Sequence, residues 1–455
     1  MSAIAGASDT IDVEARIGHW CAGLELSAVP PDVRKTATTS ILDTIGVAIA
    51  GTTTSIHSTI DHLLEQGGRH ALFNGKRAAH PGDAALLNGV AAHALDLDDT
   101  CFAGIVHGSA VVLPAVHAAC EIAEASADDM LLAYVCGIEA ECALGNAFTD
   151  ALYERGYWTT ATLGAMGAAV GAAKGMRMSA TQVAEAVRLA AQMAPGMRSS
   201  HGSDAKPFLC GHAARIGLEC ALAARAGVTC TSGALLGPFG FAAVHNQGVF
   251  RRECVEALGQ RWSLRTPGIA YKFYPLCSAT QAAIEASLSL RPQIGSRSVS
   301  AITCRATPFA VGCLPYRHPA SPGQAQFSLT FAVACALLHG DVGIDHLSPA
   351  VVAAPEITQL MDRIRVVPDH SITTGQDMQQ VPEAASVELV LDDGSNLSAT
   401  VLAATGMPFA PADEQRLKRK FIDCASRVFG IAIAESLHRQ FTDMTGLPLL
   451  ALPTA

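Results

Sequence analysis

A chain of 455 residues is too long for one hydrophobic core, so we expect two or three domains. Half of the residues are hydrophobic while only 5% are aromatic, which predicts a core of small aliphatic side chains, as in closely packed helices. The formal charge of −10, with no run of basic residues, argues against nucleic acid or an anionic membrane surface as the main partner.

The N-terminal segment and the cysteines indicate the compartment. The first twenty residues carry acidic side chains and lack a basic region followed by an apolar one, so no signal peptide is expected. The longest apolar run, residues 161–173, is too short to span a bilayer. The fourteen cysteines are scattered without a Cys-x-x-Cys pair, so we expect reduced thiols, no metal site and a cytoplasmic protein.

Helical periodicity dominates the chain up to about residue 265, where no convincing strand is found. A capping box formed by Ser179 and Gln182 starts one of these helices. The predicted helices are residues 10–24, 30–51, 82–94, 111–125, 130–148, 160–174, 180–193, 211–226 and 249–258.

The pattern then changes to a mixture of strands and helices. Strands are predicted at 298–307 and 362–367, and a hairpin at 386–403 that turns on an Asp-Gly pair. Between them lie predicted helices at 278–290 and 323–339, and helices at 412–429 and 431–440 end the chain. The sequence therefore predicts a mainly α protein, with an all-helical domain (1–267 and 404–455) and a smaller α+β domain (268–403).

One polar stretch, residues 89–108, stands out in this apolar chain. It contains three carboxylates, two imidazoles and a hydroxyl: His93, Asp96, Asp98, Asp99, Thr100 and His107. Burial of such a cluster is costly unless its members are paired or functional. The alternative is that one aspartate caps a helix while the others face water.

Three further segments are candidates for a binding site. The loop 198–206 holds Arg198 and Lys206 amid Gly and Ser, where the lysine could hold an anionic oxygen or be a solvated surface group. Lys272 lies between aromatic residues, which favours the edge of a pocket because rings prefer burial and an ammonium does not. Tyr316 lies between a strand and a helix and alone is a common turn residue.

Two other motif interpretations fit poorly. Residues 96–100 match the DxDxT nucleophile motif of haloacid-dehalogenase-type phosphatases, but that motif ends a buried strand, and LLNGVAAHAL (86–95) is helix-like. A magnesium–diphosphate site of the terpene-synthase kind requires DDxxD and aromatic-rich helices, and the sequence has neither.

Taken together, these segments resemble the MmgE/PrpD family, which includes 2-methylcitrate dehydratase, cis-aconitate decarboxylase and iminodisuccinate epimerase. The likeness is carried by VPPDVRKTATTSILDTIGVAIAG (29–51), LLNGVAAHALDLDDT (86–100), HGSAVVLPAVHA (107–118), DAKPFLCGHAAR (204–215), YKFYPLC (271–277) and, more weakly, 325–342. The resemblance implies a helical domain built from both chain ends, an α+β lid domain, a homodimer, and no metal or organic cofactor.

The resemblance also implies roles for particular residues. Asp96 and Thr100 match the family's polar pair, and His107 matches its active-site histidine. Lys206 and Lys272 match the lysines that bind substrate carboxylates. Tyr316 is a looser match to a tyrosine of the lid. Two lysines, with Arg198, would neutralise a di- or tricarboxylate and stabilise an enolate-like charge, while a carboxylate or imidazole moves protons.

Two positions depart from the family pattern. Trp158 and Gln281 stand where the family usually has histidines. Gln281 can be structural, whereas Trp158 adds apolar bulk near the expected substrate and cannot carry a proton. We therefore hypothesise that Trp158 contacts the substrate, and that this substrate has fewer carboxylates or a hydrophobic substituent.

The leading prediction is a cofactor-independent hydro-lyase that dehydrates a hydroxy acid of the 2-methylcitrate type. The alternatives are a cis-aconitate-type decarboxylase, an epimerase of an amino or imino dicarboxylate, and a non-catalytic carboxylate-binding homologue. The three reactions share an anion site and a carbanionic stage, so residue types alone do not separate them.

Overall fold

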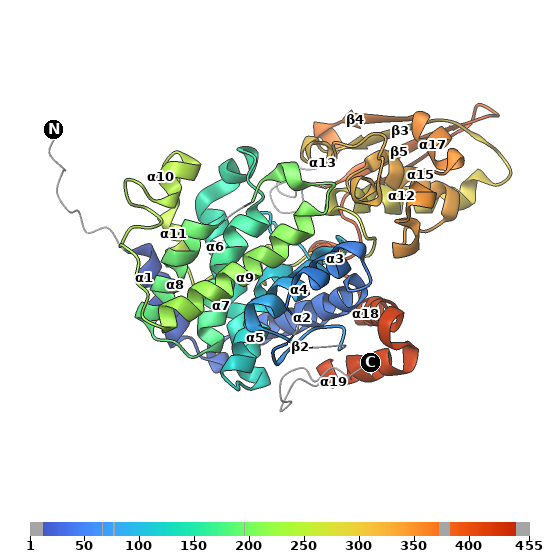
Figure 1. Ribbon diagram of the computed structural model, residues 1–455. Helices are drawn as coiled ribbons and strands as arrows, with labels where there is room; N and C mark the ends of the chain where they lie inside the picture. The colour runs from blue at the N-terminus through green and yellow to red at the C-terminus, as the bar shows by residue number, and fades with distance from the viewer. Residues whose placement is uncertain (1–11, 66, 76–77, 195, 373–382, 443–455) are drawn as a thin grey trace.

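Two groups of elements, each around its own hydrophobic core, make up the fold (Figure 1). The computed structural model describes residues 12–65, 67–75, 78–194, 196–372 and 383–442. The larger core is formed by helices from the N-terminal part of the chain and by the last two helices. The smaller core lies in the segment between them. The chain is thus mainly α, with a helical domain and a smaller α+β lid.

The helical domain contains most of the helices. They are α1 (Val13–Gly23), α2 (Pro31–Gly51), α3 (Ser55–Leu63), α4 (Pro81–His93), α5 (Gly108–Ile122), α6 (Ala127–Glu154), α7 (Thr159–Gly175), α8 (Ala180–Met193), α9 (Ala205–Arg225), α10 (Phe241–Asn246), α11 (Arg252–Glu256), α18 (Glu414–Phe429) and α19 (Ile431–Thr442).

The centre of this domain is α7, which packs against α5, α6 and α9. Small residues allow these helices to approach closely. A Cβ atom on Gly137 of α6 would lie 2.5 Å from the Val112 side chain and 3.0 Å from the carbonyl oxygen of Gly167. The low aromatic content of the sequence therefore corresponds to a core in which backbones, rather than large side chains, are in contact.

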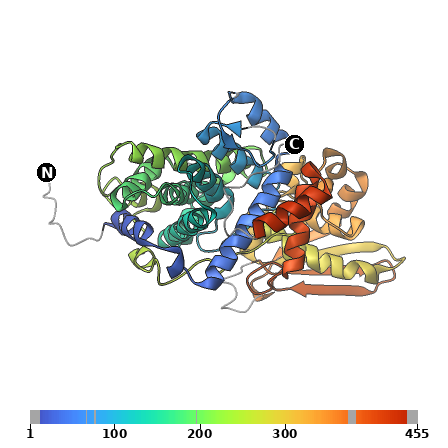
Figure 2. The same cartoon turned by 90° about the horizontal axis from the view of Figure 1, so that it is seen from below.

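The lid is built on a four-stranded sheet. Its elements are α12 (Gln281–Ile294), β3 (Val299–Ala306), α13 (Pro308–Cys313), α14 (Pro322–Ala325), α15 (Leu329–His339), α16 (Pro349–Val352), α17 (Pro355–Asp362), β4 (Ile364–Pro368), β5 (Ala385–Leu391) and β6 (Asn396–Val401). The strand order is β4-β3-β5-β6 (Figure 2), with β3 parallel to β4 and antiparallel to β5. The β5–β6 hairpin turns at Gly394, whose φ of 82° suits glycine.

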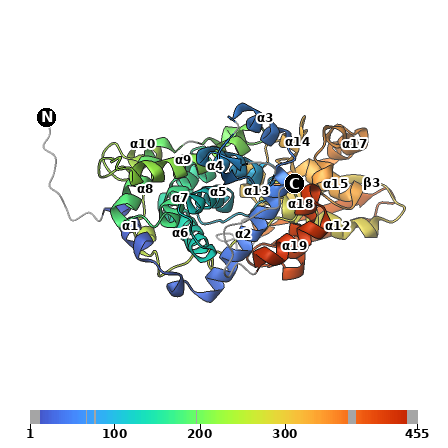
Figure 3. The ribbon, with the colours of Figure 1, turned by 60° about the horizontal axis from the view of Figure 1, so that its bottom comes forward.

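The last two helices return to the helical domain. Both α18 and α19 pack against α2 (Figure 3), and Phe421 and Leu437 belong to the larger core. A buried ion pair, 2.7 Å from Lys420 Nζ to Asp43 Oδ1, joins α18 to α2. This packing explains how two distant parts of the sequence form one body.

The structure corrects three local predictions. A two-stranded ladder, β1 (His70–Ala71) with β2 (Ala78–Ala79), lies in the part predicted to lack strands. Helix α9 begins at Ala205, six residues early, because Pro207 is tolerated in a first turn that needs no amide partner. The predicted helix 323–339 is two helices, separated where the Ser328 side chain caps α15.

Helix α6 is long and apolar enough to cross a membrane by length and composition alone. Its most apolar window is 89% buried inside the fold, which is typical of a core helix.

Candidate active site

The polar stretch of residues 94–107 forms a loop between α4 and α5. Two backbone hydrogen bonds fix it to the domain junction: Thr100 N donates to Ala270 O (2.9 Å) and Ala270 N donates to Thr100 O (2.8 Å). Asp96 has a φ of 48°, a left-handed conformation that aspartate tolerates. This geometry brings the loop against the segment that carries Lys272.

Asp96 is the centre of a buried ionic cluster. Its Oδ1 lies 2.5 Å from Lys272 Nζ and its Oδ2 lies 3.3 Å from Lys206 Nζ. Burial favours the neutral carboxyl, but the two ammonium groups outweigh it and hold the pKa of Asp96 well below its usual range. Asp96 is therefore a permanent carboxylate and a poor base.

Asp98 holds two imidazoles in one orientation. His93 Nδ1 lies 2.7 Å and His107 Nδ1 lies 3.3 Å from Asp98 Oδ2. Burial lowers the pKa of His93 to about 4 and also lowers the pKa of His107, so both rings are neutral near pH 7. Because His107 Nδ1 faces Asp98 and the carbonyl of Asp99 (2.9 Å), its Nε2 is the nitrogen left for a substrate.

A small cavity of about 30 Å³, the inner chamber, lies next to this cluster. Its lining includes Thr100, His107, Trp158, His201, Lys206 and Glu383. Residues of the helical domain and of the lid both line it, so it is a site at the domain junction. A cavity of this size holds about one water molecule.

The sequence-predicted residues occupy different positions around the inner chamber. Thr100, His107, Trp158 and Lys206 line it. Asp96 and Lys272 lie behind the wall, and Lys272 is fully buried against Asp96 and Asp98. Lys272 thus touches carboxylates of the protein rather than the cavity.

The two remaining predicted residues frame the site without lining the inner chamber. Arg198 lines a neighbouring cavity, with its guanidinium 3.9 Å from the centre of the Tyr153 ring. The Tyr316 hydroxyl donates to the carbonyl oxygen of His201 over 2.8 Å. Tyr316 therefore ties the lid to the loop that presents His201.

The structure adds two groups that received no role from the sequence. His201 stacks on Phe327 of the lid with ring centres 4.9 Å apart, and its buried Nε2 has no hydrogen-bond partner in the part of the chain that the structure describes. Burial lowers the pKa of His201 to about 2. Glu383 accepts from the Ser278 hydroxyl over 2.7 Å, while its buried Oε2 has no hydrogen-bond partner among the described residues. Burial raises the pKa of Glu383 to about 7.

The sequence contains a clue to His201 but none to Glu383. His201 lies in the polar loop 198–206, which the sequence already marked. Glu383 is 105 positions from its partner Ser278, so no local pattern could have found it. Gln281 is structural: it accepts from the amides of Phe273 and Tyr274, each over 3.2 Å, and donates to carbonyls of the same turn.

The cluster does not suit a resident metal ion. Ligand atoms of His93, Asp96, Asp98 and His107 lie within 4.8 Å of one another. However, both oxygens of Asp96 face ammonium groups, and the Lys206 ammonium also lies 2.5 Å from His93 Nε2. Two lysines thus supply the positive charge that a divalent cation would bring to these donors.

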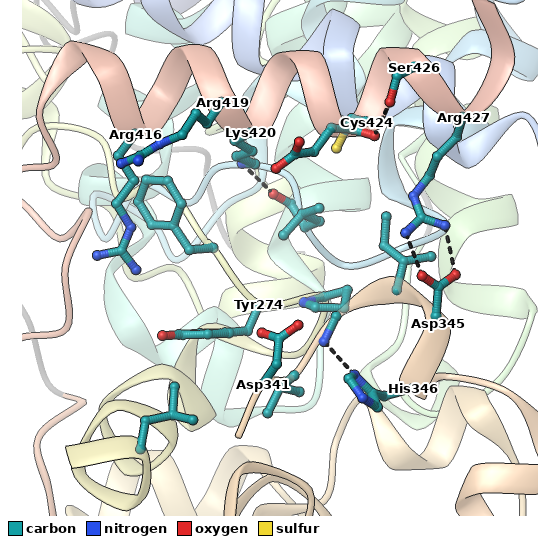
Figure 4. Close-up of a pocket in the computed structure, with 18 residues that line it drawn as sticks. Tyr274, Asp341, Asp345, His346, Arg416, Arg419, Lys420, Cys424, Ser426 and Arg427 are labelled. Carbon is teal, nitrogen blue, oxygen red and sulfur yellow. Dashed lines mark hydrogen bonds and ion pairs between the residues drawn. The ribbon is translucent and has the colours of Figure 1, made fainter. Parts of the chain in front are cut away.

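A separate cavity of about 670 Å³ lies between α18 and the lid (Figure 4). Arg427 donates to both carboxylate oxygens of Asp345 over 2.8 and 2.9 Å, and Gly343 N donates to His346 Nδ1 over 2.9 Å. The Arg427–Asp345 ion pair joins α18 to the lid, whereas the Gly343–His346 hydrogen bond lies within the lid. None of the residues predicted for the site lines this cavity.

Fold and site together define a two-domain enzyme with buried lysine, carboxylate and imidazole groups at the domain junction. The chain belongs to the MmgE/PrpD family: residues 15–253 match the MmgE/PrpD N-terminal domain and residues 274–441 match the C-terminal domain. The second match includes α18 and α19, which pack with the helical domain.

Several relatives of known name cover nearly the whole chain. Cis-aconitate decarboxylase of Aspergillus terreus (strain NIH 2624 / FGSC A1156) is 28% identical, over 97% of this chain and 95% of the relative. Cis-aconitate decarboxylase of Homo sapiens is 24% identical, over 91% and 88%. The cis-aconitate decarboxylase-like protein oryM of Aspergillus oryzae (strain ATCC 42149 / RIB 40) is 26% identical, over 92% and 91%.

Proposed function

We propose that this protein decarboxylates an unsaturated carboxylic acid of the cis-aconitate type without a cofactor. The observation that carries the proposal is that the Lys206 ammonium and the Glu383 carboxyl both line one buried chamber. The names of the relatives support the same reaction. Decarboxylation needs a cation for the developing charge and one proton donor, and it needs no base.

The chemical steps follow from the substrate type. In such an acid, a carboxymethyl group is attached to a C=C bond whose far carbon carries a second carboxylate. The bond to the departing carboxylate breaks, carbon dioxide leaves, and the electron pair shifts through the double bond to the far carbon. The resulting enolate-like charge is stabilised by Lys206. A proton then bonds to that carbon.

Glu383 is our candidate for the proton donor. A carboxyl whose pKa is raised to about 7 by burial is protonated in a large fraction of molecules near neutral pH, and no group in the described part of the chain competes for its Oε2. The surrounding Trp158 and Phe327 exclude water, so the carbanion meets this acid rather than solvent.

Dehydration remains the second candidate because the site also offers a base. His107 Nε2, oriented through its Nδ1 by Asp98, could remove an α-proton while Glu383 protonates the departing hydroxyl. Trp158 weakens this option, since an indole stands where the family usually supplies another imidazole.

A proton NMR time course in deuterated buffer tests the proposal. The protein, treated with a chelator to remove metal ions, is incubated separately with cis-aconitate, 2-methylcitrate and malate-type acids. We expect carbon dioxide release from cis-aconitate-type acids with one deuteron in the product. The Lys206→Met variant should lose about 100-fold or more in kcat/KM, whereas Lys35→Met, which removes an exposed ion pair with Glu414, should not. An alkene formed from a hydroxy acid without carbon dioxide release would establish the dehydratase instead.

A further inference from the structure

A much larger cavity adjoins the inner chamber. This outer chamber has a volume of about 790 Å³ and lies between α6, the loop 102–105 and α13 of the lid. The two chambers share five lining residues, which we call the neck: Phe102, Ile105, Tyr153, Phe309 and Cys313. Cavities that hold small molecules usually measure about 300–1,000 Å³, so the outer chamber, unlike the inner one, has the size of a ligand site.

The neck is apolar and its polar atoms are already paired. The Tyr153 hydroxyl is hydrogen-bonded to Cys313 Sγ over 3.3 Å, and the Tyr153 ring lies 6.1 Å from the Phe309 ring. The guanidinium of Arg198 is stacked on Tyr153 and donates to the carbonyl of Gly312 over 3.3 Å. The five side chains of the neck therefore offer a carboxylate no free hydrogen-bond donor in exchange for its hydration, and the nearby guanidinium of Arg198 lies in the lining of the outer chamber.

Two β-branched residues along this path have a positive φ. Ile105 has a φ of 55° and Thr149, which lines the outer chamber, has a φ of 62°. A left-handed conformation is a genuine outlier for β-branched residues and costs about 1–3 kcal/mol each. At Ile105 this conformation presents the side chain at the neck, and the Ile105 carbonyl accepts from the Thr159 hydroxyl over 2.6 Å.

Trp158 restricts the other end of the path. Its fully buried indole lies 5.0 Å from Lys206 Nζ and 5.2 Å from the His93 ring. The space left beside Lys206 is only about 30 Å³, which leaves room for a reacting acid group but not for a whole tricarboxylate lying within the inner chamber.

We propose that the substrate carries an aliphatic substituent, which passes through the neck into the outer chamber while its acid groups face Lys206. This inference rests on the proposed function for the reaction, but it concerns the substrate class. The outer end of the chamber is lined by exposed polar residues, Asp150, Glu154 and Arg251, so the far end of the substituent approaches solvent.

Binding of unreactive acids tests this inference independently of catalysis. Methyl-, butyl- and hexylsuccinate have the same two carboxylates and alkyl groups of increasing length, and calorimetry gives their dissociation constants. Each methylene buried in an apolar passage should tighten binding about fourfold. A flat or falling affinity along the series would overturn the proposal.

Two variants locate the binding to the neck. Ile105→Gly removes a side chain from the passage and relieves the positive φ, so we expect no loss in the free energy of unfolding, together with a weaker dependence on chain length. Phe309→Ala should likewise weaken the dependence of affinity on chain length. Phe239→Ala, at a side chain that is 92% exposed, is the matched control and should leave the series unchanged. Equal responses of all three variants would contradict a passage at the neck.

The two proposals fail in different ways. Tight binding of hexylsuccinate without turnover of any unsaturated acid would overturn the decarboxylase and retain the aliphatic site. Rapid decarboxylation of cis-aconitate with a flat succinate series would retain the reaction and overturn the aliphatic substituent.

Discussion

Replacing Lys272 should lower the free energy of unfolding, because Lys272 contacts buried carboxylates of the protein rather than the cavity in which a substrate would bind. Lys272 is fully buried, and its Nζ lies 2.5 Å from Asp96 and 3.5 Å from Asp98. The carboxylates of Asp96 and Asp98, opposed by burial, raise the pKa of Lys272. The Lys272→Met variant leaves these carboxylates buried with one cation fewer.

The expected magnitude follows from the cost of an uncompensated buried charge. Breaking a buried ion pair by removing one partner typically costs about 3–5 kcal/mol. Lys206→Met is the matched comparison: Asp96 keeps Lys272 as a partner, and the vacated position borders a cavity that can admit water. We expect Lys206→Met to lower the free energy of unfolding by about 1–3 kcal/mol. Its kcat should fall at least as much as that of Lys272→Met.

Urea unfolding at constant pH, followed by circular dichroism, measures the free energy of unfolding. Steady-state kinetics with an acid that the NMR time course shows to react measures kcat and KM. The reasoning would be refuted if Lys272→Met unfolded with the wild-type free energy while its KM rose. That result would mean that Lys272 binds a substrate carboxylate directly, as the sequence predicted, and that the contacts with Asp96 and Asp98 are exchanged for substrate.

Four further predictions concern single positions. In the dehydration alternative, where His107 Nε2 is the base, Asp98→Asn should lower kcat by about 100- to 10,000-fold because the ring loses the carboxylate that orients it; decarboxylation, which needs no base, should be slowed far less, and single-turnover kinetics on the folded variant separates the two reactions. If the protonated form of Glu383 is the donor, kcat should fall as pH rises through about 7, and in Glu383→Gln a pH–rate profile should show lower activity without that alkaline limb. Gln281→Leu should cost about 2–4 kcal/mol in urea unfolding, since it leaves buried amides and carbonyls without partners. Trp158→His should raise kcat/KM for cis-aconitate relative to a long-chain analogue, and an unchanged ratio in competition assays would count against steric selection by the indole.

The helical part of the fold was predictable because its signals are local. Periodicity and the capping box at Ser179 identified α8 to the residue, and the Asp-Gly pair identified the hairpin of the lid. The short helices α3, α10 and α13, and the β1–β2 ladder, were not found. Elements of two to nine residues carry too few residues to establish a period, and their stability comes from tertiary packing.

The sequence alone determined which residue types could carry chemistry here and the family to which the chain belongs. Clustering within twenty residues marked the loop of Asp96 and His107, since chain connectivity guarantees their proximity. Only the tertiary structure decided which groups face the cavity. The family resemblance gives Lys206 and Lys272 the same role, yet one lines the inner chamber and the other is enclosed. The contacts of Lys206 and Lys272 with Asp96 span 110 and 176 positions of the chain. Such long-range contacts depend on how the helices and the lid pack together, so a local sequence pattern does not predict them.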